Sequence, residues 1–355
     1  MRYLITGGAG FIGSHLADAL TAQPSNVTIV DDFSTGRREN IEQLVASGTV
    51  QLLEGSVTDP ALIDDAMAEC DYCIHLASAV GVKLVVSNPL QTLHRIVHGS
   101  DVVMAAAARH SKRVLFASTS EVYGKASHQP LHEEADRVLG SSSKSRWTYA
   151  IAKTYGEALA HSYHREHGTD TTVVRLFNTI GARQRGTYGM VVPRLVAQAI
   201  AGSSLTVYGD GSQSRCFLHV TDAVDAILAL THHPAATGRT FNIGNPMPVT
   251  ILQLARMILG RTQSRSQIAL IPYEQAYDSG FEELGRRRPD TRALTELTGW
   301  RPRHTLYDAL DDVIAYQRAE LAIAGHRQPD QLEHQRHRHQ RPVSIQSTQA
   351  TPAAA

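Results

Sequence analysis

A glycine-rich segment near the N-terminus limits what this chain can fold into more than any other feature of the sequence. Residues 7–13 read GGAGFIG, follow an apolar strand pattern directly and open a helix pattern. Glycines at this junction permit a tight turn and let a phosphate group approach the backbone at the positive end of the helix. Asp31 comes 18 residues after Gly13, where a carboxylate can accept hydrogen bonds from ribose hydroxyls. The segment therefore predicts a dinucleotide site. Its expected contacts are Gly7, Gly10, Phe11, Ile12, Gly13 and Asp31.

The charge at the end of the second predicted strand indicates which dinucleotide binds. A carboxylate at Asp31 repels a 2′-phosphate, which favours NAD over NADP. Arg37 and Arg38 are the opposing observation, because both are close enough in sequence to bind such a phosphate. We predict NAD as the cofactor.

Strand and helix patterns alternate through the first two-thirds of the chain. The predicted strands are residues 3–6, 27–30, 51–53, 72–76, 114–117 and 172–176, and the predicted helices between them are residues 11–22, 61–69, 90–109 and 149–167. This alternation predicts an α/β protein with a parallel sheet that is covered on both faces. Beyond residue 178 the pattern is less regular, with predicted helices at 191–201, 221–232, 251–259 and 306–320.

Three regions follow from these patterns. We predict a Rossmann-type, doubly wound NAD-binding domain over residues 1–177 and a smaller C-terminal α/β substrate lobe over residues 178–324. Residues 325–355 contain few large apolar side chains, so they cannot offset the entropy cost of ordering, and we predict a disordered tail.

Composition excludes several classes of protein. The 355 residues carry 34 basic and 34 acidic side chains, a balance that argues against a nucleic-acid or anionic-membrane partner. Three cysteines are too few for a disulfide scaffold, and the pair Cys70 and Cys73 has no second pair to complete a zinc site, so we predict no metal. The sequence shows no apolar run of about 18 residues and no signal-peptide pattern, and we expect a cytoplasmic protein.

Reactive side chains follow the predicted strand 114–117 and begin the predicted helix 149–167. Thr119, Ser120 and Glu121 stand at the carboxyl edge of the sheet, where open α/β sheets bind ligands. Tyr149 and Lys153 are four residues apart, so they share one helix face. A nearby ammonium and a positive nicotinamide ring would lower the pKa of the phenol and let Tyr149 act as a base near neutral pH.

With these residues in place, the sequence resembles the extended short-chain dehydrogenases of the NAD-dependent epimerase/dehydratase family over about residues 1–320. The matching segments are the glycine motif, His75-Leu76-Ala77, the Tyr149/Lys153 pair, Arg175-Leu176-Phe177-Asn178 and Tyr208-Gly209-Asp210-Gly211 with Arg215. The resemblance implies that the protein oxidises C4 of a nucleotide sugar, with Tyr149 as the base, Thr119 bound to the same oxygen, and Leu76 and Ala77 beside NAD. Ser56 and Ile96 depart from the family pattern and put the strength of cofactor binding in question.

The same resemblance implies a substrate site and a partner. Asn178 and Arg215 would hold the nucleotide diphosphate, since an amide and a planar cation suit phosphate oxygens, and Tyr208 would be a further substrate-binding residue. Members of this family usually form homodimers by pairing the helices that correspond to residues 90–109 and 149–167.

Glu121 and its neighbours bear on which sugar reaction takes place. Simple 4-epimerases commonly carry a small residue at the position of Glu121, and 4,6-dehydratases pair a glutamate there with an aspartic acid where this chain has Ser120. Ser120-Glu121, Arg146-Trp147-x-Tyr149 and the arginines around Arg287 resemble UDP-glucuronate decarboxylases, in which Arg287 would bind or protonate near the sugar. We predict a UDP-glucuronate decarboxylase. A 4-epimerase, a 4,6-dehydratase and a catalytically inactive NAD-binding regulator remain alternatives.

Overall fold

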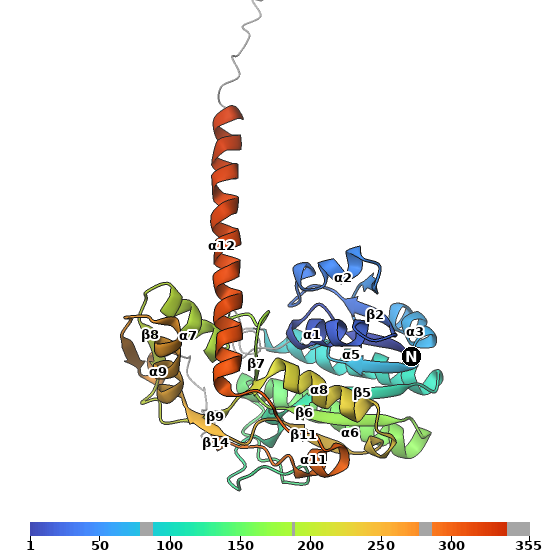
Figure 1. Ribbon diagram of the computed structural model, residues 1–355. Coiled ribbons are helices and arrows are strands. Elements are labelled where there is room, and N and C mark those ends of the chain that lie inside the picture. The colour runs from blue at the N-terminus through green and yellow to red at the C-terminus, as the bar shows by residue number, and fades with distance from the viewer. Residues whose placement is uncertain (79–87, 187–188, 277–285, 339–355) are drawn as a thin grey trace, which may run out of the picture.

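The computed structural model describes residues 1–78, 88–186, 189–276 and 286–338 (Figure 1). A seven-stranded sheet lies at its centre in the order β11-β6-β5-β4-β1-β2-β3, and neighbouring strands run parallel. β1 and β4 flank the point at which the strand order reverses, which is where open α/β sheets bind ligands. The predicted doubly wound α/β sheet is confirmed. Its strands are β1 (Arg2–Thr6), β2 (Asn26–Asp31), β3 (Val50–Glu54), β4 (Tyr72–His75), β5 (Arg113–Thr119), β6 (Thr171–Leu176) and β11 (Thr240–Ile243).

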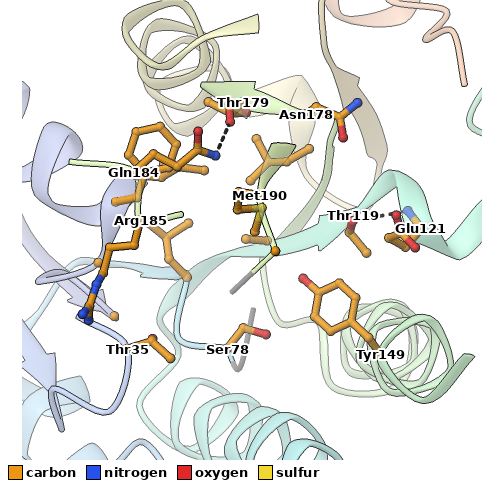
Figure 2. A pocket seen from close by; sticks show the side chains of 18 of the residues that line it. Thr35, Ser78, Thr119, Glu121, Tyr149, Asn178, Thr179, Gln184, Arg185 and Met190 are labelled. Atoms are coloured by element: carbon orange, nitrogen blue, oxygen red, sulfur yellow. Dashed lines mark hydrogen bonds between the residues drawn. The ribbon is translucent and has the colours of Figure 1, made fainter. Parts of the chain in front are cut away.

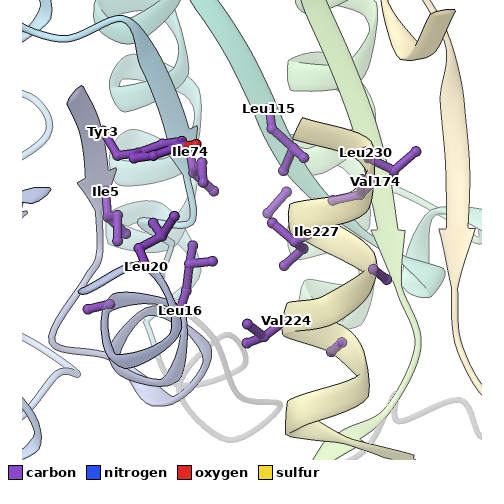
Figure 3. Packing of buried hydrophobic residues seen from close by; sticks show 14 of the residues in the cluster. Tyr3, Ile5, Leu16, Leu20, Ile74, Leu115, Val174, Val224, Ile227 and Leu230 are labelled. Carbon is purple, nitrogen blue, oxygen red and sulfur yellow. The ribbon is translucent and has the colours of Figure 1, made fainter. Parts of the chain in front are cut away.

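Helices cover both faces of this sheet. Successive side chains along a strand point to opposite faces, and the apolar side chains on each face pack against helices. Tyr3 and Ile5 of β1 pack on one face with Leu16 of α1 and Ile227 of α8 (Figure 3). Leu4 points to the other face, into a second cluster that holds residues of α3, α5 and α6. These two buried layers fix the position of the strand ends. The helices of this part are α1 (Phe11–Thr21), α2 (Glu42–Ala46), α3 (Pro60–Glu69), α5 (Pro89–Arg109), α6 (Thr148–His167), α8 (Val220–Thr231) and α11 (Arg292–Thr298), with 3₁₀ turns η1 (Arg38–Asn40), η2 (Ser120–Tyr123), η3 (Ser145–Trp147) and η4 (Pro234–Ala236).

A smaller lobe packs beside the carboxyl edge of the sheet. Its core is a separate apolar cluster, in which Leu195, Leu254 and Leu310 are fully buried. Three short sheets surround it: β7 (Thr179–Ile180) with β10 (Leu218–His219); β8 (Leu205–Tyr208) with β13 (Ile268–Ile271); and β9 (Ser214–Cys216) between β12 (Pro248–Thr250) and β14 (Arg286–Arg287). Its helices are α7 (Val191–Ile200), α9 (Ile251–Thr262), α10 (Tyr273–Ala276) and the beginning of α12 (Leu306–Arg338).

The predicted division after residue 177 does not match how the chain is arranged in space. β11 pairs with β6 and completes the large sheet, and α8 covers one face of that sheet, although both lie within the region predicted as the substrate lobe. The chain therefore crosses between the two parts more than once. Pairing of strands that are 64 or more residues apart leaves no local pattern, so the sequence could not indicate it.

The C-terminal prediction also differs from the structure. α12 continues through Arg338, where the sequence predicted a helix only to residue 320 and a disordered tail from residue 325 (Figure 1). Gln, Arg, Leu and Ala in this segment favour a helix, but Gly325 and Pro329 oppose one, so helix propensity does not explain why α12 continues. Residues 339–355 lie outside the described part of the chain.

Within the described ranges, none of the helices is long and apolar enough to cross a membrane. The cytoplasmic location stays a prediction.

Candidate active site

The glycine-rich turn between β1 and α1 can be built only with glycine at its key positions. Gly7 has a φ of +76°, and a Cβ atom there would lie 2.8 Å from the backbone of Ala77. A Cβ atom at Gly13 would lie 2.3 Å from the carbonyl oxygen of Gly7. The turn therefore packs against the end of β4 with backbone alone.

This turn also suits the diphosphate of a dinucleotide. Gly10 is the N-cap of α1 and makes no side-chain capping hydrogen bond, so the first amides of the helix are left for a ligand. Gly7, Gly10 and Gly13 all line one cavity, together with Asp31 at the end of β2. Amides at a helix N-terminus and a carboxylate near the ribose position are the donor set and acceptor that NAD requires, so the residues fit this cofactor.

Asp31 holds the turn as well as facing the cavity. Its Oδ2 atom accepts a hydrogen bond from the amide of Ala9 and its Oδ1 atom accepts one from the amide of Phe33, each at 2.9 Å. Burial raises the pKa of Asp31, and the two amide hydrogen bonds act in the opposite direction.

The two arginines that opposed an assignment to NAD are both engaged by carboxylates. Arg37 pairs with Glu320 of α12 and donates to the hydroxyl of Tyr316 at 3.3 Å. Arg38 pairs with Glu54 at the end of β3. Neither guanidinium is held ready for a 2′-phosphate, which removes the observation that favoured NADP.

We expect the double variant Arg37→Gln/Arg38→Gln to keep its preference for NAD. Because both side chains already serve carboxylates and Asp31 remains, the Kd for NAD should change less than about threefold and NADP should bind no better, in line with the small energies of exposed ion pairs. Titration calorimetry with both dinucleotides measures this. A large loss of NAD affinity in the double variant would show that these arginines contact the cofactor.

A single cavity of about 470 Å³ joins the cofactor turn to the smaller lobe. Every residue that the sequence assigned to the cofactor, catalytic or substrate site lines it, from Gly7 of the turn to Arg287 of β14. The elements that contribute these residues are far apart in the chain, and the two-part fold brings them together.

Tyr149 and Lys153 stand at the start of α6 beside the end of β5. The Tyr149 ring points into the cavity, between the side chains of Thr119 and Ser78 (Figure 2). Lys153 is 2% exposed, and its Nζ atom donates to the carbonyl oxygen of Ala117 at 2.7 Å. This hydrogen bond fixes the ammonium one helical turn below the phenol.

The pKa of Tyr149 differs from the sequence-based expectation. Removal from water raises the pKa of Tyr149 above its ordinary value, although the hydroxyls of Ser78 and Thr119 act in the opposite direction. Burial also lowers the pKa of Lys153 to about 7. The sequence-based prediction of a lowered Tyr149 pKa counted the positive nicotinamide ring of the bound cofactor. Within the protein itself, desolvation of the phenolate has a larger effect on this pKa than the neighbouring groups do.

Glu121 lies between two guanidinium groups. It follows β5 in η2, where its Oε2 atom lies 2.6 Å from the Nη2 atom of Arg146, and its Oε1 atom pairs with Arg287. Arg287 and Arg146 are only 7% and 8% exposed. Burial alone would raise the pKa of Glu121, but the two positive charges overcome this and lower it to about 2. Glu121 is therefore an anion at every physiological pH.

Arg146 is the site residue that sequence reasoning missed. The sequence singled out its motif as a resemblance but assigned Arg146 no role, because a lone arginine in a polar segment usually faces solvent. Its place three residues before Tyr149 was the available signal, since η3 turns directly into the helix that carries the base.

The predicted substrate residues reach the cavity from the smaller lobe. Asn178 follows β6 and donates to the carbonyl oxygen of Cys216 at 3.2 Å, which ties the sheet to β9. Arg215 of β9 is paired in register with Arg287 of β14. Tyr208 ends β8 and also lines the cavity. Two arginines on adjacent strands give this side of the cavity the positive charge that an anionic ligand needs.

Comparison with known proteins agrees with this arrangement. The model of the NAD-dependent epimerase/dehydratase family matches residues 3–244. The chain is 39% identical over 318 residues to a UDP-N-acetyl-alpha-D-glucosaminuronate decarboxylase of Bacillus cytotoxicus, covering 89% of this chain and 98% of the relative. It is 37% identical over 320 residues to UDP-glucuronic acid decarboxylase 1 of Danio rerio, covering 90% of this chain and 73% of the relative.

A solved structure gives the same picture of the fold. The UDP-glucuronic acid 4-epimerase of Bacillus cereus, in complex with UDP-glucuronic acid and NAD, superposes with a TM-score of 0.81 at 25% identity, covering 90% of this chain and 99% of that one. The glycine turn, the Tyr149/Lys153 pair and these matches lead to one conclusion: the chain belongs to the NAD-dependent epimerase/dehydratase family.

Proposed function

We propose that this protein is an NAD-dependent decarboxylase of a UDP-hexuronate, with UDP-glucuronate as its substrate. The observation that carries the proposal is the buried Arg146–Glu121–Arg287 cluster beside Tyr149, which has one more positive than negative charge. A carboxylate on the sugar would balance that charge. The relatives from Bacillus cytotoxicus and Danio rerio are named as decarboxylases of UDP-linked uronates, which supports the same reaction.

Tyr149 is the base in this proposal. As a phenolate, its oxygen would take the proton of the sugar C4 hydroxyl, while Thr119 hydrogen-bonds the same sugar oxygen. When it is protonated, Lys153, which is fixed on the carbonyl oxygen of Ala117, would place a positive charge beneath the phenol and lower the cost of forming the phenolate. When bound, NAD supplies the oxidising power by accepting the hydride from C4.

Arg287 and Tyr149 then act on the β-keto acid that oxidation at C4 creates. Arg287 pairs with the C6 carboxylate and orients it. The C5–C6 bond breaks, its electron pair moves into an enolate that ends on the C4 oxygen, and CO2 leaves. Tyr149, now a neutral phenol, donates a hydrogen bond to that oxygen, and C5 then takes up a proton from water to give the 4-ketopentose. Glu121 has too low a pKa to serve as a strong proton acceptor, so we assign it the role of orienting Arg287.

The nucleotide half of the substrate would lie against the smaller lobe. Arg215 and Asn178 offer a guanidinium and an amide to the diphosphate, and Tyr208 offers an aromatic face beside them. These roles are part of the proposal.

The same experiment also tests one further substrate and two alternative reactions. The relative from Bacillus cytotoxicus is named for a uronate with an acetamido group, so such a sugar is the second substrate to test. The similarity to a UDP-glucuronic acid 4-epimerase makes epimerisation at C4 the alternative reaction. Dehydration is least supported, because Ser120 cannot protonate a leaving hydroxyl as a carboxylic acid can.

The experiment incubates the NAD-loaded protein with UDP-glucuronate, its acetamido analogue and UDP-glucose in parallel, and identifies the products by mass spectrometry and NMR. A decarboxylase yields a UDP-linked pentose or ketopentose from a uronate and leaves UDP-glucose unchanged. Formation of a UDP-hexuronate isomer without loss of CO2 would contradict the proposal and support the epimerase.

We also propose that the protein forms a homodimer through α5 and α6. Leu90 of α5 is 67% exposed, and Tyr155 of α6 is 40% exposed, which leaves apolar surface on both helices. Light scattering after size-exclusion chromatography is expected to give twice the mass of one chain. A monomeric mass at micromolar concentration would contradict this assembly.

A further inference from the structure

Arg146 is held in place by more than its contact with Glu121. It lies in η3, between the loop and the first turn of α6, and its Cζ atom stands 5.7 Å from the centre of the fully buried Trp147 ring. Tyr149 is only three residues further along, so Arg146 and Tyr149 belong to one continuous helical segment in which η3 runs directly into α6.

Glu121 divides its two oxygens between two cations. Oε2 faces Arg146 and Oε1 faces Arg287, and the Glu121 side chain is 15% exposed. The backbone amide of Glu121 donates to the Thr119 hydroxyl at 3.2 Å, so the backbone of Glu121 is also fixed to a residue beside Tyr149. Arg287 additionally lies 3.5 Å from the Ser120 hydroxyl.

The arrangement leaves one positive charge in excess among these three buried groups. When a carboxylate binds at Arg287, the cluster becomes neutral, with two guanidiniums and two carboxylates. Without Arg146, the same binding event would leave a buried excess negative charge, which is costly to remove from water. Charge balance therefore accounts for a second buried arginine, Arg146, even if Arg146 does not contact the substrate.

We propose that Arg146 is a positioning residue: its ion pair with Glu121 is retained when Arg287 binds the carboxylate of a uronate. Its single function in this view is to let two carboxylates share the buried cluster. The inference deepens the proposed function and depends on it only in that the ligand is a uronate. It holds equally for a decarboxylase and for a uronate epimerase.

The proposal predicts a specific pH dependence of uronate binding, because binding and protonation of Glu121 are linked. With both arginines present, the pKa of Glu121 is about 2. The protein should therefore bind a uronate without protonation of Glu121. In an Arg146→Gln variant, the second carboxylate raises the pKa of Glu121 and binding takes up a proton, so affinity falls as pH rises. The other charged or titratable groups that face this cluster are Tyr149, whose pKa Glu121 raises, and Arg215, which acts on Arg287.

The experiment measures Kd values for UDP-glucuronate and for UDP-glucose by calorimetry, using NAD-loaded protein in a Tyr149→Phe background so that neither ligand reacts. UDP-glucose lacks the carboxylate, so the ratio of the two Kd values isolates the effect on the uronate. With Arg146 intact, the ratio should be the same from about pH 6 to about pH 8. Arg146→Gln should weaken UDP-glucuronate relative to UDP-glucose by about tenfold or more, and the loss should grow with pH.

Two control variants separate charge from structure. Arg146→Lys keeps the positive charge and should restore most of the ratio, whereas Lys144→Gln removes a positive charge two residues away and should leave the ratio unchanged. Equal weakening of both ligands in Arg146→Gln, or an unchanged ratio that stays flat with pH, would overturn the proposal.

A measurement on the protein with Arg146 intact remains decisive even if Arg146→Gln does not fold. Calorimetry in two buffers of different ionisation enthalpy should show that UDP-glucuronate binding takes up no more protons than UDP-glucose binding, a comparison that cancels the titration of Lys153. Additional proton uptake with UDP-glucuronate would overturn the proposal. Release of CO2 by the unmodified enzyme is measured separately, so failure of the proposed reaction and failure of this inference are distinguishable.

Discussion

Replacing Tyr149 with phenylalanine is expected to lower kcat by about 10³-fold or more while leaving the Kd for NAD unchanged, as the loss of a general base commonly costs 10²- to 10⁴-fold. The ring points into the cavity between Thr119 and Ser78, so its oxygen, once deprotonated, is placed to take a proton from the substrate (Figure 2). Removing one oxygen atom leaves the ring and its packing in place. Steady-state turnover of UDP-glucuronate and NAD titration by calorimetry measure the two quantities.

Tyr155→Phe is the matched control for this change. Tyr155 lies on the same helix, is 40% exposed and donates to Asp101 of α5 rather than to the cavity. Its kcat should stay within about twofold of the unmodified protein, since exposed positions away from a site have small effects. If Tyr149→Phe kept more than a tenth of the activity, the assignment of Tyr149 as the base would be wrong.

Replacing Glu121 with glutamine is expected to lower both stability and activity. The change leaves Arg146 and Arg287 buried without their shared carboxylate, and breaking a buried ion pair from one side costs about 3 to 5 kcal/mol. Loss of the contact that orients Arg287 should also reduce CO2 release by about 10²-fold or more. Urea unfolding gives the free energy of unfolding, and the turnover assay gives the second effect.

The pH dependence of stability provides an independent view of the same cluster. The pKa of Glu121 is about 2 in the folded protein, against an ordinary value of 4.5. A lowered pKa means that the contribution of Glu121 is complete above pH 4.5 and is lost as the pH falls from 4.5 towards 2. The shift corresponds to about 3 kcal/mol, in agreement with the cost expected for breaking the pair.

Glu134→Gln is the control for stability. Glu134 is exposed, so replacing its carboxylate should change the free energy of unfolding by less than about 0.5 kcal/mol. The difference in stability between the unmodified protein and Glu121→Gln should shrink below about pH 4, where Glu121 becomes protonated in the unfolded chain. A difference that stays constant down to about pH 2.5 would contradict the ionic role of Glu121.

The predicted site residues that the structure gathers around one cavity were identified from local patterns. The turn at Gly7 to Gly13 is set by glycine positions within one strand-helix junction, and Tyr149 with Lys153 is set by spacing on one helix. The helix and strand periodicities of the first 177 residues were equally local, and the structure matches them to within one or two residues. All of these segments then meet at the carboxyl edge of the sheet because parallel strands end on the same side.

The parts that the sequence did not predict depend on contacts between distant residues. Arg37 meets Glu320 across 283 positions, so sequence proximity to Asp31 suggested a phosphate contact that its partner on α12 removes. β11 joins the large sheet from within the second predicted region. Arg146 gains its place in the site only through burial beside Glu121, 25 residues earlier in the chain. Burial and pairing of this kind leave no periodic signal.

The most direct test of the proposed decarboxylation follows the carboxyl carbon of the substrate. The NAD-loaded protein is incubated with UDP-glucuronate labelled with ¹³C at C6, and labelled CO2 and the remaining UDP-sugar are followed together by NMR. A decarboxylase releases one labelled CO2 for each substrate consumed and leaves an unlabelled UDP-linked pentose or ketopentose. Complete retention of the label in UDP-galacturonate, with no labelled CO2, would contradict the proposed reaction.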